Sequence, residues 1–363
     1  MRIGILVGRD DFFDYISKTE LKRLLSQYKN PNKFFRNREY ISTDIIVGAE
    51  LMRYKNVEVD LILPREISVR RLLSNDVVFP LGYYLLDAFV DKKYDKVREI
   101  FKEAGNVFPL MNMQDFILKK GKYYEHLKRN KIPIAPTFSI YANDRKRNAK
   151  FVYDKVRKLG WAMFITKPIM SGWGLGFKMW NLYDFNPDEW DKYINSKLIK
   201  GYPGIILQQA VPGFKQEQEI RTYWFQGKYA YAVGTIHNFD TQLDDLMEER
   251  QLNKKDLAYC KKIGEKVMKI LPKMKVEGQV IKPTLIRLDF GCCHKDNYNT
   301  PNAYFINEVE GQGANLFAEA INPKIYSLFA KTLYNTAKQL SISDKFQAKY
   351  DYTPTVKKQR KFN

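Results

Sequence analysis

Short apolar runs alternate with longer amphipathic segments along the first hundred residues. The runs Ile3–Val7, Val57–Leu63 and Asp76–Pro80 have the length of strands, and a proline terminates the second and third, as expected at the end of a strand. Strands separated by helix-length segments predict a parallel, doubly wound sheet. The helix-length segments are Glu20–Tyr28, Asp44–Arg53 and Tyr84–Val90.

Residues 106–160 contain the first boundary between lobes. Asn106–Pro109 predicts one more short strand, and the polar segment after it predicts a helix that ends near Asn130. Lys131–Thr137 contains two prolines and predicts an extended connector, because the residue before a proline avoids helical geometry. We place a lobe boundary at this connector, before a helix at Ala149–Leu159.

Strand signals dominate the second half of the chain. Ile220–Phe225 and Tyr229–Thr235 predict a hairpin, with Gln226 and Gly227 as its turn, because glycine readily adopts the positive φ that tight hairpin turns need. The other predicted strands are Ala162–Thr166, Phe177–Trp180, Ile205–Gln209, Thr284–Phe290 and Ala303–Val309.

Two helices are predicted in the same half. Apolar residues from Leu257 to Leu271 recur at steps of three and one, the spacing of one helix face. Pro323–Leu340 predicts a closing helix. The acidic segment 237–256 is open to two interpretations, a part of the substrate-binding side or a solvated helix, and we favour the solvated helix.

Length and composition indicate a folded, multi-lobed protein. The chain has 363 residues, of which 45% are hydrophobic and spread throughout, so it can bury a large core. No apolar run approaches the roughly 18 residues of a membrane-spanning helix. We therefore expect no membrane partner.

The net charge of +20 is high enough to attract polyanions such as nucleic acids, nucleotides or acidic peptides. A lysine-rich surface without a dedicated partner explains the same charge equally well. The basic residues are scattered and no RNP, KH or helix-turn-helix pattern occurs, so nucleic acid is not the favoured partner. The basic stretch Lys357–Lys361 is expected to be a solvated tail.

The three cysteines do not form a framework of paired disulfides, and two of them, Cys292 and Cys293, are adjacent. This usage indicates a reducing compartment, and hence a cytoplasmic location. Cys292, Cys293 and His294 lack a second ligand pair at a suitable spacing, so we disfavour a metal site there.

The first segment with chemical potential joins a lysine to a glycine-rich loop. Lys167 ends an apolar strand, and Ser171, Gly172, Gly174 and Gly176 follow. Backbone N–H groups of such a loop can approach phosphates, while the lysine adds a positive charge. The spacing fits neither the dinucleotide fingerprint nor the Walker A loop. A plain hairpin turn is the competing interpretation.

The second segment is a strand that stops at a Pro-Gly pair. Backbone groups of Gln208, Gln209 and Ala210 can pair there with the edge of an adenine base. Glu217 or Glu219, shortly afterwards, can accept hydrogen bonds from ribose hydroxyls, and Arg221 suits phosphate oxygens. A surface strand of mixed charge would look the same.

The third segment carries the most weight. Asp289 lies in an apolar strand two residues after Arg287, and Glu308 and Glu310 share one face of the next strand. Three carboxylates that converge would repel each other unless a divalent cation lies among them. An all-oxygen ligand set suits Mg²⁺ shared with nucleotide phosphates.

In this order and spacing, the three segments resemble the ATP-grasp superfamily over roughly residues 106–340. The likeness is to its carboxylate–amine ligases, such as D-alanine–D-alanine ligase, glutathione synthetase and the ribosomal-protein glutamate ligases. It implies an α/β fold with α+β lobes: an N-terminal doubly wound parallel sheet followed by a two-lobed ATP-grasp fold. The implied divisions are a pre-ATP-grasp domain at 1–105, a small lobe with the glycine-rich loop at 106–200, a large lobe with the metal site at 201–343, and a basic tail at 344–363.

The resemblance also implies roles for individual residues. ATP would lie between the lobes, with adenine at Gln208–Ala210. Mg²⁺, or Mn²⁺ in its place, would bind Asp289, Glu308 and Glu310, although the family often has Asn where Glu310 stands. The bulky Trp173 is a second departure, in a loop that covers phosphates. The other implied contacts are Lys122 (with Lys119 and Lys120 as alternatives), Lys167, Ser171, Gly172 and Gly174 to the phosphates, Glu217 or Glu219 to the ribose, and Arg221 and Arg287 to the reacting groups.

The activity implied by this family is a ligase that converts a carboxylate to an acylphosphate and transfers it to an amine. The alternatives are an ATP-grasp kinase that phosphorylates a different acceptor, a basic nucleic-acid-binding protein, and a scaffold that binds ATP without catalysis. The substrate would be a small molecule or a peptide, and the positive charge favours an anionic one. A homodimer is one assembly that the resemblance leaves open.

Overall fold

The computed structural model describes residues 1–8, 43–144, 147–172, 174–211, 218–237, 244–292 and 304–341. The helix expected at Glu20–Tyr28 and the basic tail lie outside these ranges, as do Trp173, Glu217, Cys293 and His294. None of the helices in the described ranges combines the length and the apolar character needed to cross a bilayer.

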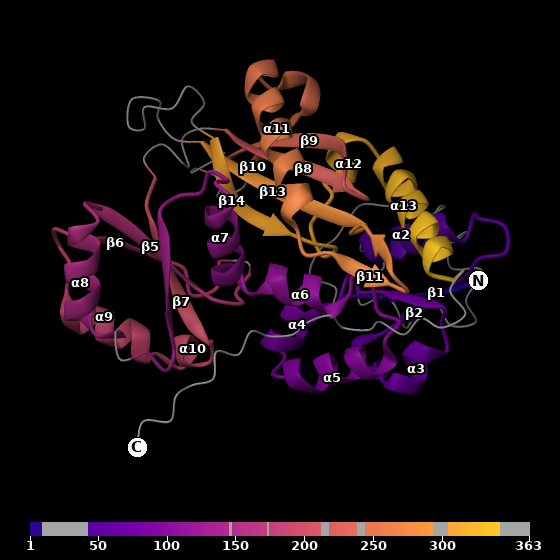
Figure 1. Ribbon diagram of the computed structural model, residues 1–363, viewed down its shortest axis with the longest axis horizontal. Helices are drawn as coiled ribbons and strands as arrows, with labels where there is room; N and C mark the ends of the chain where they lie inside the picture. Colours follow the sequence, from indigo (N-terminus) through magenta and orange to yellow (C-terminus); the bar gives the residue numbers. More distant parts are fainter. Residues whose placement is uncertain are drawn as a thin grey trace.

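The N-terminal domain is built on a three-stranded parallel sheet of order β2-β1-β3. Helices cover both of its faces, as a doubly wound topology requires, and the C-terminal helix is one of them (Figure 1). Tyr54 and Tyr334 stack at 4.2 Å where α13 packs near α2. The elements are β1 (Arg2–Leu6), β2 (Glu58–Ile62), β3 (Val77–Phe79), α2 (Thr43–Leu51), α3 (Val69–Leu73), α4 (Leu85–Val90), α5 (Tyr94–Ala104) and α13 (Lys324–Ser341).

The segment after this sheet departs from the expectation in two ways. Asn106–Pro109 is not a strand: Val107 forms only an isolated bridge to Val78, and Pro109 has no N–H with which to continue the pairing. The single helix expected next is two helices, α6 (Met111–Leu118) and α7 (Lys120–Arg129), because Lys119 leaves helical geometry at ψ 71°.

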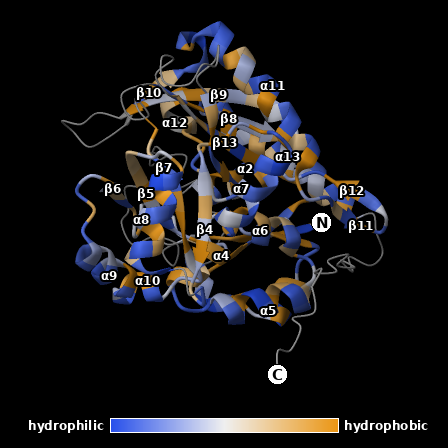
Figure 2. Ribbon diagram, turned by 60° about the vertical axis from the view of Figure 1, so that its left-hand side comes forward, coloured by the Kyte–Doolittle hydropathy of each residue, from blue (hydrophilic) through white to orange (hydrophobic). Residues whose placement is uncertain are grey.

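The small lobe is a four-stranded antiparallel sheet of order β4-β7-β5-β6, packed against helices on one face. Its separate core contains Phe164, Trp180 and Trp190, and in Figure 2 strand β5 is mainly apolar while α9 is largely polar. The elements are β4 (Thr137–Tyr141), β5 (Met163–Pro168), β6 (Lys178–Asn181), β7 (Gly204–Gln209), α8 (Ala149–Lys158), α9 (Pro187–Asn195) and α10 (Lys197–Lys200).

The strand pairing extends the small lobe beyond residue 200, where we placed its end. Strand β7 pairs with both β4 and β5, so residues 204–209 lie in the middle of this sheet. Strand β4 was not predicted, because it follows Pro136 directly and we assigned its first residue to the connector.

The large lobe is a five-stranded antiparallel sheet of order β10-β9-β8-β13-β14. The predicted hairpin is confirmed, with Gln226 at φ 49° and Gly227 at φ 72° in its turn. Its elements are β8 (Glu219–Phe225), β9 (Lys228–His237), β10 (Asp244–Glu248), β13 (Leu285–Cys292), β14 (Tyr304–Glu310), the short hairpin β11 (Met274–Val276) and β12 (Gln279–Ile281), and the helices α11 (Lys254–Ile270) and α12 (Ala318–Ile321).

Part of the acidic segment for which we favoured a solvated helix is a strand. Asp244–Glu248 pairs antiparallel with the end of β9 and forms the edge of the sheet. Charged side chains suit an edge strand, because they discourage pairing with other chains. Helical periodicity was absent from this segment, and composition alone did not distinguish the two structures.

Candidate active site

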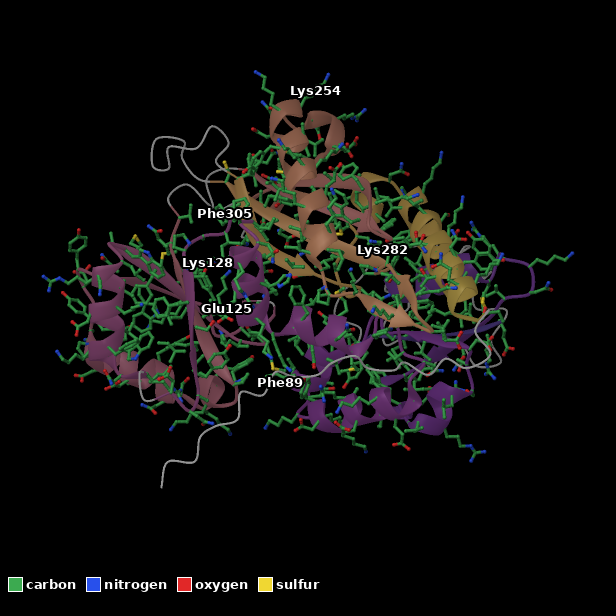
Figure 3. The ribbon with its side chains drawn as sticks, viewed as in Figure 1. Phe89, Glu125, Lys128, Lys254, Lys282 and Phe305 are labelled. Carbon is green, nitrogen blue, oxygen red and sulfur yellow. The ribbon has the colours of Figure 1, made fainter. Side chains whose placement is uncertain are left out.

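A cleft of about 890 Å³ lies between the small-lobe sheet and the large-lobe sheet. One wall comes from β5, β7 and the glycine-rich loop, and the other from β8, β13 and β14. Phe305, labelled in Figure 3, lies on the side of the large lobe that is nearer the small lobe. All the predicted site residues in the described ranges line this cleft, except Lys122 and its alternative Lys119.

Three carboxylates converge on the large-lobe wall. Asp289 on β13 pairs in register with Glu308 on β14, and Glu310 follows two residues later on the same strand. One oxygen from each of the three lies within 4.8 Å of the others. Asp289 is only 3% exposed, so part of this negative charge is held away from water.

Two buried cations partly neutralise the carboxylates. Arg287 donates from Nε and Nη2 to the two oxygens of Asp289, both at 2.7 Å, and its Nη2 also lies 3.1 Å from Glu310. Lys120 Nζ lies 2.7 Å from an oxygen of Glu308. Arg287 lies on β13 and Lys120 on α7, and both elements pack into the same core. Their charges are therefore held close to the carboxylates.

The pKa values of the carboxyl groups diverge in this environment. Burial raises the pKa of Glu310 to about 7, and the charges of Glu308 and Asp289 add to the shift. Burial also opposes ionisation of Glu308, but the positive charges of Lys120 and Lys167 outweigh it and lower its pKa to about 2. Glu219 resembles Glu310, because burial and the charge of Asp289 raise its pKa to about 7.

The cluster fits a hard divalent cation. Its donors are all carboxylate oxygens, and the two cations paired with them, Arg287 and Lys120, leave one of the three negative charges without a counter-charge among these contacts. Mg²⁺ is bound in proteins by such oxygens together with substrate phosphates. A carboxylate offers about four lone-pair sites, so Asp289 can accept from Arg287 and still present oxygen to a cation.

Lys120, and not Lys122, is the lysine of α7 that reaches the cleft. Lys120 lines the cleft and contacts Glu308, whereas the side chain of Lys122 is exposed outside it. Lys119 lies 3.5 Å from Asp115 instead. We therefore move the assignment from Lys122 to Lys120. The break at Lys119 changes which side of the helix faces the cleft, and uniform helical spacing does not reveal such a break.

Lys167 and the glycine-rich loop line the small-lobe wall of the cleft. Lys167 Nζ donates to Asn307 Oδ1 at 3.4 Å, a contact that spans the two lobes. Gly174 and Gly176 have φ near 70°, a backbone conformation that favours glycine. Ser171, Gly172 and Gly174 line the cleft, as expected for a phosphate-covering loop.

The end of strand β7 and the adjacent Ala210 line the cleft. They offer fewer free hydrogen-bond donors than we expected. The N–H of Gln209 donates to Pro136 and that of Ala210 donates to Met163, while the side chain of Gln208 donates to Thr137. The N–H groups of Gln209 and Ala210 are therefore engaged within the small lobe in this conformation.

Glu219 and Arg221 lie on β8, next to the carboxylate cluster, and Arg221 pairs in register with Asp289 of β13. They share β8 and form an ion pair at 3.3 Å, and the Arg221 guanidinium lies over the ring of Phe317 at 5.3 Å. Both line the cleft. This places one acid whose pKa is raised and one arginine beside the convergent carboxylates.

An apolar wall of the cleft was missed in the sequence. It consists of Met163, Ile165, Leu175, Phe177 and Met179. Met163, Ile165 and Lys167 alternate along β5 and so face the same side of the sheet. That alternation, counted back from Lys167, was the signal that could have revealed the wall.

A second, smaller pocket of about 80 Å³ adjoins the cleft and is almost entirely apolar. It shares Lys120, Ser171, Gly172 and Glu310 with the cleft. Its apolar side chains come from the N-terminal domain, from α6 and from the end of β14. These include Leu85 and Leu86 of α4 and Ile117 and Leu118 of α6.

Comparison with known proteins identifies the fold through structure and not through sequence. No family model matches the chain, and no curated protein matches it. D-cycloserine synthetase DcsG is similar over 94% of this chain and 100% of its own, with a TM-score of 0.64 and 12% identity. D-alanine–D-alanine ligase from Bacillus anthracis, in complex with ATP, is similar over 94% of this chain and 98% of its own, with a TM-score of 0.58 and 14% identity.

A third neighbour is the ATP-grasp ligase PsnB, in complex with a phosphomimetic variant of its minimal precursor, Mg and ADP. It has a TM-score of 0.54 and 12% identity, and the match covers 92% of this chain and 98% of PsnB. The chain thus has the ATP-grasp fold, which confirms the expected fold class, and its structural neighbours are ATP-grasp ligases.

Proposed function

We propose that this protein is an ATP-dependent ligase that joins a carboxylate to an amine through an acylphosphate. One observation carries the proposal. Asp289, Glu308 and Glu310 converge in a cleft between two lobes, flanked by Lys120, Lys167, Arg221 and Arg287. With Glu219, four carboxylates and four cations line this cleft, a balance that suits a substrate that brings both phosphates and their metal ions.

The two lysines are suited to the phosphates of ATP. Lys120 of α7 and Lys167 of β5 approach neighbouring residues of β14, because Lys120 contacts Glu308 and Lys167 donates to Asn307. Phosphates that attract Lys120 would leave Glu308 free to bind a cation. Asp289, Glu308 and Glu310 would hold Mg²⁺ or Mn²⁺, which would screen the phosphate charge while the substrate carboxylate attacks.

The walls of the cleft would contact the base and the ribose of the nucleotide. The apolar wall of the small lobe provides a surface against which a base can pack, and Gln208–Ala210 lies beside it. Glu219 would accept hydrogen bonds from the ribose hydroxyls, for which its ionised form is the better acceptor. Ser171, Gly172 and Gly174 would cover the phosphates.

The arginines would act on the reacting groups. Asp289 and Glu310 hold Arg287 in place, so its charge is pre-positioned beside the carboxylate cluster. Arg221 is paired with Glu219 at the longer distance of 3.3 Å. Both could stabilise the negative charge that develops when the amine attacks the acylphosphate. The mechanism needs no covalent intermediate on the protein.

The small pocket beside the cleft would receive a substrate group. It adjoins Glu310 and Lys120, close to the phosphate end, and its walls are apolar. A compact, uncharged aliphatic group would fill it better than a charged one, because burial of an unpaired charge is costly. We therefore propose a small molecule or peptide with an aliphatic group next to the reacting centre, in place of the anionic substrate that the net charge favoured.

The decisive experiment is a substrate screen. The protein would be incubated with ATP and Mg²⁺ and panels of amino acids, amines and short peptides, with ADP release as the readout and mass spectrometry of the products. ADP, phosphate and a new amide are expected. A stable phosphorylated product without an amide would instead identify a kinase.

Glu308→Gln gives a residue-level check of the same proposal. The substitution keeps the size of the side chain but removes the charge that attracts a cation, so turnover should fall by about a hundredfold or more. Glu265→Gln, on the exposed side of α11, is the matched control and should retain full turnover. Wild-type turnover in Glu308→Gln would refute the assignment of the metal site.

A further inference from the structure

A second large groove lies outside the cleft, between helices α7 and α11. It measures about 640 Å³ and is formed by the end of α7, the connector that follows it, and one face of α11. Figure 3 labels Lys128 on α7 and Lys254 at the start of α11, the two helices that bound it. His126 of α7 bonds to the carbonyl of Ile270 at 2.7 Å and holds the two helices together.

Among the described residues, four lysines and no acidic residue line this groove. Lys128 and Lys131 come from the α7 side, and Lys262 and Lys266 come from α11. All four side chains are exposed. Within the described ranges no carboxylate lies at ion-pair distance from any of them, whereas the neighbouring Lys261 is paired with Glu249 at 3.1 Å. The groove therefore presents four positive charges without internal compensation.

The backbone at Lys131 is unusual for a lysine. Its φ is 57°, the left-handed conformation in which helices commonly end, and which glycine or asparagine usually adopts. A residue with a Cβ at such a position is under backbone strain. Lys131 thus lines the groove from a position that glycine would occupy with less strain.

The floor of the groove is apolar. It contains Ile132, Pro133, Ile134 and Pro136 of the connector and Ile263 of α11, with Tyr259 beside them. Among the described residues that line the groove, Tyr259 is the one aromatic side chain, so successive nucleobases find little to stack on, since base stacking uses aromatic side chains and arginine. The combination of an aliphatic floor with lysine walls matches a chain that carries both aliphatic and acidic side chains.

We propose that this groove binds an acidic peptide segment in extended conformation. Alternate residues of an extended chain point in opposite directions, so aliphatic side chains can face the floor while carboxylates face the lysines. The peptide would belong to a partner protein. This role gives part of the +20 net charge a specific use, and it is independent of the chemistry in the cleft.

The groove and the cleft lie on the two sides of the same connector. Ala135 lines the cleft, whereas Ile134, Pro136 and Thr137 line the groove. The connector also pairs with β14 at Ile306, one residue from Phe305 of the cleft. A bound peptide would thus rest against the segment that joins α7 to the small-lobe sheet.

Peptide binding to the full-length chain tests the proposal. The probe is a fluorescein-labelled peptide of about ten residues that alternates Glu and Val, followed by fluorescence anisotropy. A triple variant is made in which Lys128, Lys262 and Lys266 are all changed to Glu. It should bind the peptide at least about tenfold more weakly, since three exposed ion pairs are lost. The matched control changes Lys197, Lys275 and Lys331 to Glu, which alters the net charge equally and should change affinity by less than about twofold.

Three further measurements can overturn the proposal. If a peptide with Gln in place of Glu bound equally well, the groove would not recognise the negative charge of the peptide. If the control variant lost as much affinity as the groove variant, the loss would come from the change in net charge alone. Single-stranded RNA that binds through the groove lysines while the peptide does not would make it a nucleic-acid surface. A photo-crosslinking group in the peptide, used on the unaltered protein, should label Tyr259 or Ile263, and labelling elsewhere only would refute the site even if the variant failed to fold.

Discussion

At the scale of single residues, the charge balance of the cleft decides its chemistry. Glu308 and Glu310 lie on the same strand, two residues apart, yet their pKa values move in opposite directions. The difference comes from Lys120 and Lys167, whose charges act mainly on Glu308. Neither lysine is near the glutamates in sequence, so the local pattern of residues could not distinguish the two acids.

Lys120 and Lys122 can be separated by substitution. Lys120→Ala should weaken ATP binding by about tenfold or more and destabilise the fold, because it leaves the buried carboxylate of Glu308 without its partner. Lys122→Ala should leave both nearly unchanged, because that side chain is exposed outside the cleft. Titration with ATP and urea unfolding measure the two effects. If only Lys122→Ala lost ATP binding, our original assignment would stand.

The raised pKa values of Glu219 and Glu310 predict how stability depends on pH. Both groups have a pKa of about 7 in the folded protein against the ordinary value of 4.5. The folded state therefore retains protons that the unfolded state has released, and the metal-free protein should lose stability as pH rises from about 4.5 to about 7. Glu308, whose pKa is lowered to about 2, acts in the opposite direction and only below about 4.5.

A divalent cation should reverse this loss, because it binds the ionised carboxylates. We expect Mg²⁺ to raise the Tm more at about pH 8 than at about pH 6. Thermal unfolding with and without Mg²⁺ measures the effect. Glu310→Gln should reduce the difference between the two pH values, and an unchanged difference in that variant would contradict the role of Glu310.

At the scale of elements, one helix–strand contact sets how closely the large lobe packs. Gly264 of α11 lies against Trp224 of β8, where an added Cβ would be 2.2 Å from Trp224 Cζ2. Both residues are buried. The glycine therefore permits a close approach, at the expense of helix propensity.

Gly264→Ala should destabilise the protein by about 1–3 kcal/mol, because the clash with Trp224 exceeds the gain of about 1 kcal/mol in helix propensity. Urea unfolding gives the free energy of unfolding. In a Trp224→Phe background the smaller ring should relieve the clash, and Gly264→Ala should then cost much less. An equal cost in both backgrounds would show that the contact with Trp224 is not responsible.

At the scale of the whole molecule, the apolar cores do not follow the order of the chain. One continuous core joins the N-terminal sheet, the large lobe and the C-terminal helix α13, whereas the small lobe has a separate core. The N-terminal domain and the large lobe are thus a single packed unit, although the small lobe lies between them in sequence.

Two cores predict two unfolding steps. Ile205→Ala, in the small-lobe core, should lower the stability of one step by about 2–5 kcal/mol and leave the other unchanged. Leu333→Ala, in the continuous core, should act on the second step only. Urea unfolding followed by fluorescence and by circular dichroism resolves the steps. A single transition that both substitutions shift equally would contradict this division.

The sequence by itself determined the strands of the N-terminal sheet, the hairpin at Gln226 and Gly227, and the three segments that line the cleft. These features depend on local periodicity, turn chemistry and residue type, which neighbouring residues largely specify. The choice of Lys120 over Lys122 required the tertiary structure, because the break at Lys119 reorients α7. The edge strand Asp244–Glu248 required its pairing with β9. The opposed pKa shifts of Glu308 and Glu310, and the lysine groove between α7 and α11, depend on charges that only long-range packing brings together.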